Sequence, residues 1–174
     1  MPSQLIVISG PIASGKSTVA KLLADDVRSR GRSVAVLDLD LVYEMLSSGR
    51  KSDDRIWALA RQAAASFVTT LLTSGVDLVI LEGEFWTDAH RAPIQGLTDW
   101  PPQFVTLELD FETALDRAQG DPTRVSSRNP ALLRPHYDEF KRLRTALLAT
   151  DLVLSTAGVS ASAVASMIRD RLMP

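Results

Sequence analysis

The residues that most clearly predict chemistry lie in one short stretch near the N-terminus, Gly10-Pro-Ile-Ala-Ser-Gly15-Lys16-Ser17. This stretch fits the pattern G-x-x-x-x-G-K-[ST], whose glycines allow positive φ so that successive N–H groups turn toward phosphate oxygens. It follows the apolar run Gln4–Ile8 and precedes a helical pattern, and a helix N-terminus also favours an anion. The stretch therefore predicts a binding site for a nucleoside triphosphate.

Within this loop, the lysine and the last serine of the pattern have distinct expected roles. We expect Lys16 to reach the β- and γ-phosphates and the Ser17 hydroxyl to ligate Mg²⁺. The alternative is a glycine turn with an unrelated lysine, and the position between an apolar run and a helical pattern argues against it. The expected nucleotide contacts in the loop are Gly10, Ile12, Ala13, Ser14, Gly15, Lys16, Ser17 and Thr18.

Two acids follow the second apolar run, which we expect to be a strand over Ser33–Asp38. Asp38 and Asp40 are two residues apart, so in extended geometry they share a face at the edge where parallel sheets bind ligands. One carboxylate, with Asp38 as the metal-side candidate, would hold Mg²⁺ or its water. The other would orient an acceptor hydroxyl and take its proton. Alternatively, one of them only caps the helix that starts near Leu41.

A second group of candidates follows the third apolar run, Val76–Leu81. Glu82 stands where an acid could hold a Mg²⁺-bound water, and Glu84 with Trp86 could line an acceptor pocket. Arg55, in the polar region after the second strand, is a candidate for an anionic acceptor group, as are Arg50, Lys51 and Arg61. The alternative for this group is structural: the acid is hydrogen-bonded within the fold, and the aromatic residues belong to the core.

Three arginines, Arg117, Arg124 and Arg128, surround a polar stretch between two helical patterns. Guanidinium groups stabilise the charge on a phosphoryl group in transfer, and a mobile loop can bring them in once substrate is bound. We therefore expect a lid over about residues 118–132. We expect Arg117, directly before it, and Arg124 to be catalytic, and Arg117 and Arg128 to contact the nucleotide. The alternative is a solvated charged face.

Apolar runs alternate with helical patterns along the whole chain. Besides Gln4–Ile8, Ser33–Asp38 and Val76–Leu81, we expect strands at Gln103–Leu109 and Asp151–Leu154. We expect helices at 16–30, Leu39–Leu46, Arg55–Ser74, Ala89–Gln95, Glu112–Gln119, Ala131–Thr150 and Ser160–Leu172. Strands that are apolar without alternation are typical of a parallel sheet covered on both faces. This pattern predicts a single α/β domain over residues 1–174.

Two details of the helices are open to test. In Arg55–Ser74 we expect Ile56, Leu59, Ala63, Phe67 and Leu71 to face the core, together with Trp57. Pro135 is a point at which the helix Ala131–Thr150 could kink or restart.

Composition excludes several classes of protein. The chain has 174 residues, a formal net charge of −2, 45% hydrophobic and 23% charged residues, and no cysteine. The absence of cysteine removes disulfides and thiolate sites, and His90 and His136 have no metal-ligand spacing. The sequence has no basic stripe that would predict nucleic-acid binding. It also has no apolar run that would predict a membrane span or a signal peptide. We expect a cytoplasmic protein, a monomer or a homodimer.

The chain resembles small P-loop kinases of the nucleoside-monophosphate-kinase-like superfamily. The resemblance rests on Gly10–Ser17, the helix after it and Val36-Leu-Asp38-Leu-Asp40. Different parts of the chain are similar to adenylylsulfate kinases, shikimate kinases and chloramphenicol phosphotransferases. It implies a three-layer P-loop fold with a five-stranded parallel sheet in the order 2-3-1-4-5, ATP and Mg²⁺ as cofactors, a mobile lid, and an adenine site beside Ser155–Val159. Leu39, Leu41 and Leu81-Glu-Gly-Glu84 depart from the acceptor-site patterns of these enzymes.

We therefore expect an ATP-dependent phosphotransferase that acts on a hydroxyl of a small molecule, either a metabolite or an antibiotic. A switch GTPase is disfavoured because the fourth strand carries no base-reading N-K-x-D segment. Three alternatives stay open: a nucleoside or nucleotide kinase, a non-enzymatic ATP-binding regulatory module, and a polynucleotide-end kinase.

Overall fold

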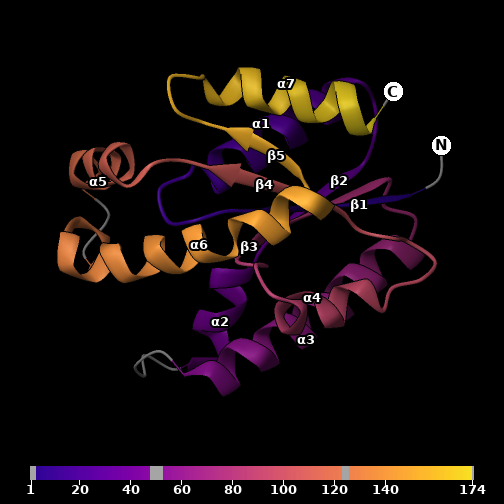
Figure 1. Cartoon of the computed structure of the whole chain (residues 1–174). Helices are drawn as coiled ribbons and strands as arrows, with labels where there is room; N and C mark the ends of the chain where they lie inside the picture. Colours follow the sequence, from indigo (N-terminus) through magenta and orange to yellow (C-terminus); the bar gives the residue numbers. More distant parts are fainter. Residues whose placement is uncertain (1–2, 48–52, 123–125, 174) are drawn as a thin grey trace.

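Five parallel strands lie at the centre of the molecule, in the order β2-β3-β1-β4-β5 (Figure 1). The computed structural model describes residues 3–47, 53–122 and 126–173. The strands are β1 Gln4–Ser9, β2 Val34–Asp38, β3 Leu78–Gly83, β4 Gln103–Glu108 and β5 Leu152–Ser155. This order and the parallel pairing confirm the predicted P-loop sheet.

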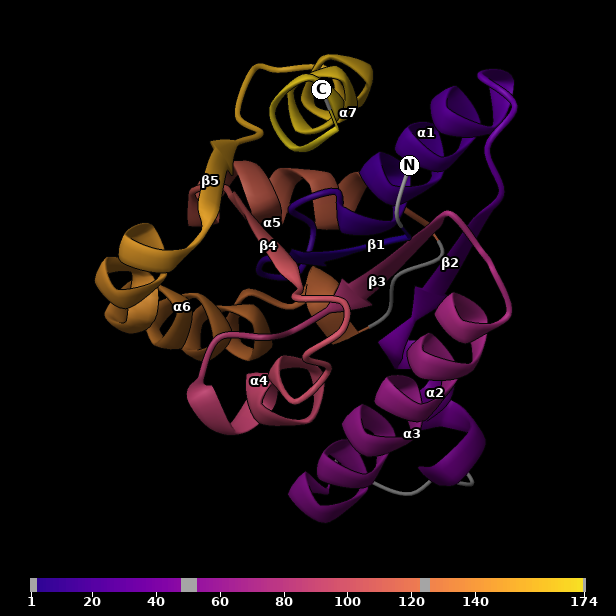
Figure 2. The same cartoon turned by 90° about the vertical axis from the view of Figure 1, so that its right-hand side faces the viewer.

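Helices cover both faces of this sheet. They are α1 Lys16–Ser29, α2 Leu39–Ser47, α3 Asp54–Thr73, α4 Asp88–Gln95, α5 Phe111–Gly120, α6 Pro130–Thr150 and α7 Ala161–Leu172, with a 3₁₀ turn, η1, at Ser126–Arg128. Figure 2 shows α1 and α7 above the sheet and α2, α3 and α4 below it. The start of α6 and α5 lie beyond the arrowheads of β4 and β5, on the left in Figure 1.

The central strand explains why two cores form. Side chains alternate along β1, so Ile6 and Ile8 enter the core under α1 and α7, while Leu5 and Val7 enter the core over α2, α3 and α4. All four are at most 1% exposed. Burial on both faces is the reason why the sequence of this strand shows no polar alternation.

The predicted helices and strands all occur, and their ends differ from the expected ones by two residues at most. α6 runs as one helix through Pro135, so the helix does not restart there. Within the described residues, no helix combines the length and the apolar character needed to cross a bilayer.

The predicted buried face of α3 was partly wrong. Leu59 and Phe67 are 49% and 48% exposed, whereas the buried face consists of Ala60, Arg61, Ala64, Ala65, Val68 and Leu72. The true face lies one position further along the chain, where small alanines let α3 approach the sheet. Trp57, expected in the core, is half-buried at the edge of that face.

Glycines bring three segments of the sheet edge close together. A Cβ built on Gly83 would lie 2.7 Å from Cβ of Leu39, so this glycine lets the end of β3 pack against the start of α2. A Cβ on Gly10 would lie 2.4 Å from the carbonyl oxygen of Leu107, so the loop after β1 rests directly on β4. The acids that follow β2 and β3 are thereby held beside the glycine-rich loop.

Candidate active site

The loop between β1 and α1 forms a small polar cavity at the carboxyl edge of the sheet. Gly15 has φ 95° and Ala13 has φ 63°, so the backbone turns through left-handed conformations before α1 begins. The Lys16 ammonium donates to the carbonyl oxygens of Gly10 at 2.9 Å and Pro11 at 3.2 Å. The cavity, about 140 Å³, is lined by Ile12, Ala13, Gly15, Lys16, Ser17, Thr18, Asp40, Glu82 and Glu84.

Two acids lie at the carboxyl ends of the neighbouring strands β2 and β3, and one of them, Glu82, bonds to Ser17. Glu82 is 4% exposed, and its Cα partner across the sheet is Asp38. Burial raises the pKa of Glu82, and a hydrogen bond with Ser17 acts in the opposite direction. Hard cations such as Mg²⁺ prefer oxygen ligands and keep several waters. Ser17, Asp38 and Glu82 fit that preference, although the described residues contain no cluster of three or more His, Cys, Asp or Glu that could hold a metal alone.

The structure separates the roles of the two acids after β2. The Asp38 carboxylate accepts a hydrogen bond from the Asp40 N–H at 2.8 Å, so Asp38 caps the start of α2. The capping alternative was considered for either acid, and the geometry gives it to Asp38. Asp40 is exposed and lines the phosphate cavity.

Helix α6 holds the rim of the loop by two consecutive side chains. The Ile12 N–H donates to Nε2 of His136 at 2.9 Å, and the Tyr137 hydroxyl donates to the Ile12 carbonyl at 2.7 Å. Burial, followed by the charge of Lys16, lowers the pKa of His136 to about 4, in keeping with a neutral ring that accepts this bond. His136 was expected only as a residue without a metal role, and its contact with a loop 124 residues away has no signal in the sequence.

A second cavity, about 240 Å³, lies on the other side of the loop, between α1 and the segment after β5. Arg117 lines it and donates to the Thr156 carbonyl at 2.6 Å and to the Ala13 carbonyl at 3.4 Å. The cavity also contacts Val159, within the segment expected to border adenine. Arg128 is exposed in η1 and does not line this cavity, and Arg124 lies outside the described residues.

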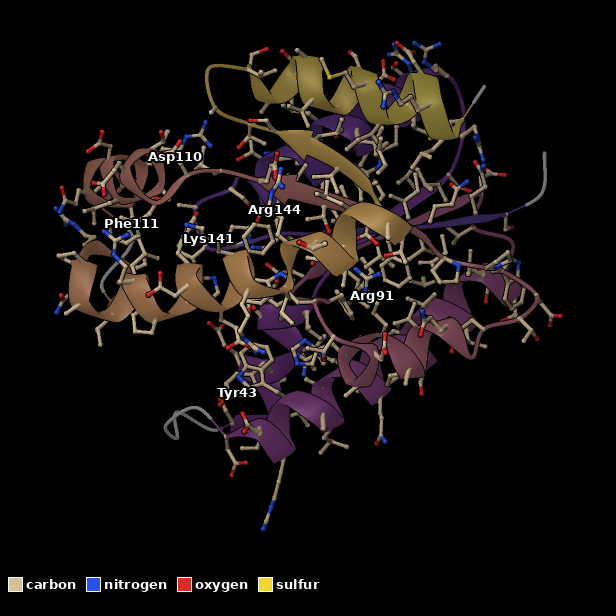
Figure 3. All side chains as sticks on the ribbon, viewed as in Figure 1. Tyr43, Arg91, Asp110, Phe111, Lys141 and Arg144 are labelled. Atoms are coloured by element: carbon tan, nitrogen blue, oxygen red, sulfur yellow. The ribbon has the colours of Figure 1, made fainter. Side chains whose placement is uncertain are left out.

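A third and larger cavity, about 970 Å³, opens between α3 and α4. Trp57 and Arg61 line it from α3, and His90 lines it from α4. Trp57 stacks with Tyr43, labelled in Figure 3, at 3.9 Å between ring centroids. Glu84 lines both this cavity and the phosphate cavity, so both cavities border on this one residue.

Two predicted acceptor residues do not lie in that cavity. Trp86 is buried against Phe140 and Leu147 of α6, and Arg55 is exposed at the first turn of α3. Arg61, which was also a candidate for an anionic acceptor group, lines the cavity and Arg55 does not, because residues six apart lie on different faces of a helix. Trp57 likewise lines the cavity in place of Trp86, and Arg50 and Lys51 lie outside the described residues. The correct helical phase of α3 would have identified Arg61 and Trp57 as the residues of this helix that line the cavity.

Solved structures share the whole fold at low sequence identity. A sugar kinase from Janibacter sp. HTCC2649 has a TM-score of 0.68 and 17% identity, covering 97% of this chain and 94% of that one. The Deinococcus radiodurans tunicamycin resistance protein has a TM-score of 0.66 and 21% identity, covering 98% and 96%. The Mycobacterium tuberculosis APS kinase CysC in complex with AMPPNP and APS has a TM-score of 0.66 and 19% identity, covering 100% of both chains.

Comparison at the level of sequence gives a family but no curated relative. No curated protein matches this chain. A family model described as an AAA domain matches residues 5–131, from β1 to the start of α6. Because this match spans more than half of the sequence and includes the phosphate loop and the acids after β2 and β3, the chain belongs to the AAA domain family.

Proposed function

We propose that the protein is an ATP- and Mg²⁺-dependent kinase that phosphorylates a hydroxyl of a small molecule bound between α3 and α4. The observation that carries this proposal is Glu84, which lines both the phosphate cavity and the 970 Å³ cavity. A molecule in the large cavity can therefore present a hydroxyl to the site of the γ-phosphate. Ligand cavities at the carboxyl edge of an open parallel sheet are the usual place for such chemistry.

The proposed roles follow from where each side chain lies. Lys16 and the loop N–H groups hold the donor phosphates, and adenine occupies the cavity beside Arg117 and Thr156. Ser17, with Asp38 and Glu82 around it, would hold Mg²⁺, which neutralises charge on the phosphate oxygens when bound. Residues 118–132 form the lid, and its arginines balance charge when it closes.

Asp40 is the residue to which we assign the acceptor proton. It lines the phosphate cavity, whereas one oxygen of Asp38 already accepts a helix N–H. In the transfer, the acceptor oxygen bonds to the γ-phosphorus as the bond from that phosphorus to the leaving ADP oxygen breaks. The hydroxyl proton passes to the Asp40 carboxylate, and Glu84 orients the hydroxyl. The solved structures described as kinases of a sugar, shikimate and APS support this reaction class.

The test is ³¹P NMR of the protein with ATP, Mg²⁺ and pooled hydroxylated metabolites, nucleosides and antibiotics. We expect a new phosphomonoester signal that is lost in Asp40→Asn and kept in Asp170→Asn, an exposed acid of α7. Slow release of inorganic phosphate, equal in wild type and Asp40→Asn and without a new ester, would contradict the kinase proposal. That result would instead favour an ATP-binding regulatory module.

A further inference from the structure

Arg61 is a buried cation without a carboxylate partner among the residues that the structure describes. Its side chain lies on the buried face of α3, and the residue is 7% exposed. Its Nη2 donates to the Glu84 carbonyl at 3.3 Å, and its Nε is buried without a hydrogen-bond partner. Among the described residues, no Asp or Glu oxygen lies within the 4.0 Å of an ion pair with this guanidinium. An arginine in this state is costly, because buried charges are normally paired.

The nearby acids do not supply the missing partner. Glu84 turns its carbonyl toward Arg61, while its carboxylate lies 3.4 Å from His136 on the side of the phosphate loop. Asp54 is exposed at the first turn of α3. Burial lowers the pKa of Arg61, and the charges of Glu84 and Asp54 only oppose that change. The guanidinium thus faces the cavity with an N–H group to spare.

A second polar atom without a partner lies in the same cavity. Nδ1 of His90, on α4, is buried without a hydrogen bond in the described part of the chain. Burial, followed by the charge of Arg61, lowers the pKa of His90 to about 4, so this ring is neutral and can donate or accept at Nδ1. Trp57 completes the wall, with its ring centroid 5.8 Å from Cζ of Arg61.

We propose that the acceptor is an acid whose carboxylate or phosphate pairs with the terminal Nη groups of Arg61, with the His90 ring in the wall beside it and the hydroxyl of the acceptor at Glu84. This inference rests on the proposed function and adds the chemical class of the acceptor. Arginine offers N–H groups in a plane that matches either anion. Because the cavity at 970 Å³ is large for a small metabolite, the anionic group fixes the orientation that brings the hydroxyl to Glu84.

The test measures binding without ATP, so that it is independent of phosphoryl transfer. Thermal unfolding of the whole chain is followed with ~10 mM of gluconate, glycerate, glucose 6-phosphate or ribose 5-phosphate, well above common KM values. Each acid is paired with its uncharged analogue, glucitol, glycerol, glucose or ribose. We expect at least one acid to raise Tm and its neutral analogue to leave Tm unchanged. A shift from carboxylates alone identifies a hydroxy acid, and one from phosphates alone identifies a phosphate ester.

Two variants assign that shift to the cavity. Arg61→Gln should weaken the binding acid about 10–100-fold, since a hydrogen bond to a charged group is lost. Arg142→Gln, at an exposed position of α6, should bind like wild type. Arg61→Lys is the control for misfolding of Arg61→Gln. It keeps the charge and should retain part of the affinity.

The outcomes of these experiments separate the two proposals. Binding of an acid that depends on Arg61, without any transfer from ATP, would sustain the acidic ligand and remove the kinase. Phosphorylation of a neutral acceptor at an unchanged rate in Arg61→Gln would sustain the kinase and overturn the acidic acceptor. A panel in which no acid raises Tm, or in which neutral analogues do so equally, also overturns it.

Discussion

Lys16 shows how a single residue can serve both the empty and the occupied loop. Its ammonium donates to the carbonyl oxygens of Gly10 and Pro11, which belong to the same loop. These bonds keep the charge solvated by backbone dipoles next to the cavity where phosphates are expected. A nucleotide would offer the ammonium charged oxygens in place of neutral carbonyls, and charge-assisted bonds are roughly twice as strong.

We predict that Lys16→Met lowers turnover of the proposed kinase by about 10²–10³-fold, the usual effect of removing one donor from developing charge. The thermal midpoint should change little, because Lys16 is half-buried at a rim and packs in neither of the two main cores. Initial rates and thermal unfolding of the same samples check this. Unchanged turnover in a folded Lys16→Met protein would show that the loop does not act on the transferred phosphate.

At the scale of elements, the burial phase of α3 can be tested by a matched pair of truncations. Val68 is fully buried and Leu59 is 49% exposed on the same helix. We predict that Val68→Ala lowers the free energy of unfolding by roughly 2 kcal/mol, because a buried side chain leaves a cavity. Leu59→Ala should change it by less than about 0.5 kcal/mol, as for most surface positions. Urea unfolding measures both, and equal losses would mean that the face predicted from the sequence is the buried one.

The contact between α6 and the phosphate loop gives the second prediction at this scale. The hydroxyl of Tyr137 donates to the Ile12 carbonyl, and the helix that carries Tyr137 begins within the region proposed as the lid. We predict that Tyr137→Phe weakens nucleotide binding about 3–10-fold, since a net hydrogen bond is worth about 1 kcal/mol and the ligand must then order the loop. Calorimetric titration with ATP and Mg²⁺ measures this change. Arg142→Ala, exposed on the same helix, is the control, and an equal loss in both variants would refute the role of the contact.

Features that depend on local spacing could be predicted from the sequence, whereas features that depend on contacts between distant residues could not. The loop Gly10–Ser17 and the strand ends at Asp38 and Glu82 follow from local spacing and from the rules of parallel sheets. Arg61 and His136 depend on the phase of a helix and on contacts between distant elements. Period and spacing place neither, so the loop could be predicted in detail while the acceptor cavity could not.

At the scale of the whole molecule, the two faces of the sheet bury different kinds of side chain. The core under α1 and α7 is apolar. On the other side, Arg61 of α3 is buried and His90 of α4 is half-buried next to a cavity, whereas Glu82 bonds to Ser17 of α1. Burial of ionisable groups costs stability and marks functional sites more often than structural ones. The face that carries α2, α3 and α4 thus holds the proposed acceptor cavity next to one of the two main cores.

The two histidines make stability depend on pH in a direction that can be worked out. Their pKa values are lowered to about 4 by burial, against about 6.5 in an unfolded chain. Their contribution is complete above pH ~6.5 and is lost as the pH falls toward 4, because the unfolded chain then binds more protons. Glu82 and Glu84 act in the opposite sense: burial raises their pKa values, so their contribution is present at low pH and is lost as pH rises through those values.

We therefore predict that wild type loses more stability than the double variant His90→Gln with His136→Gln when the pH falls from about 7 to about 5. Glutamine stays neutral over this interval and can still accept the N–H of Ile12, so the variant removes the titration with little change in packing. The difference in lost unfolding free energy should be roughly 2 kcal/mol, less than two fully buried imidazoles would give because water still reaches both rings. Since both proteins keep Glu82 and Glu84, the opposing effect of the acids cancels in the comparison. Urea titrations at several pH values measure the two profiles, and parallel profiles would show that neither histidine is held neutral by the fold.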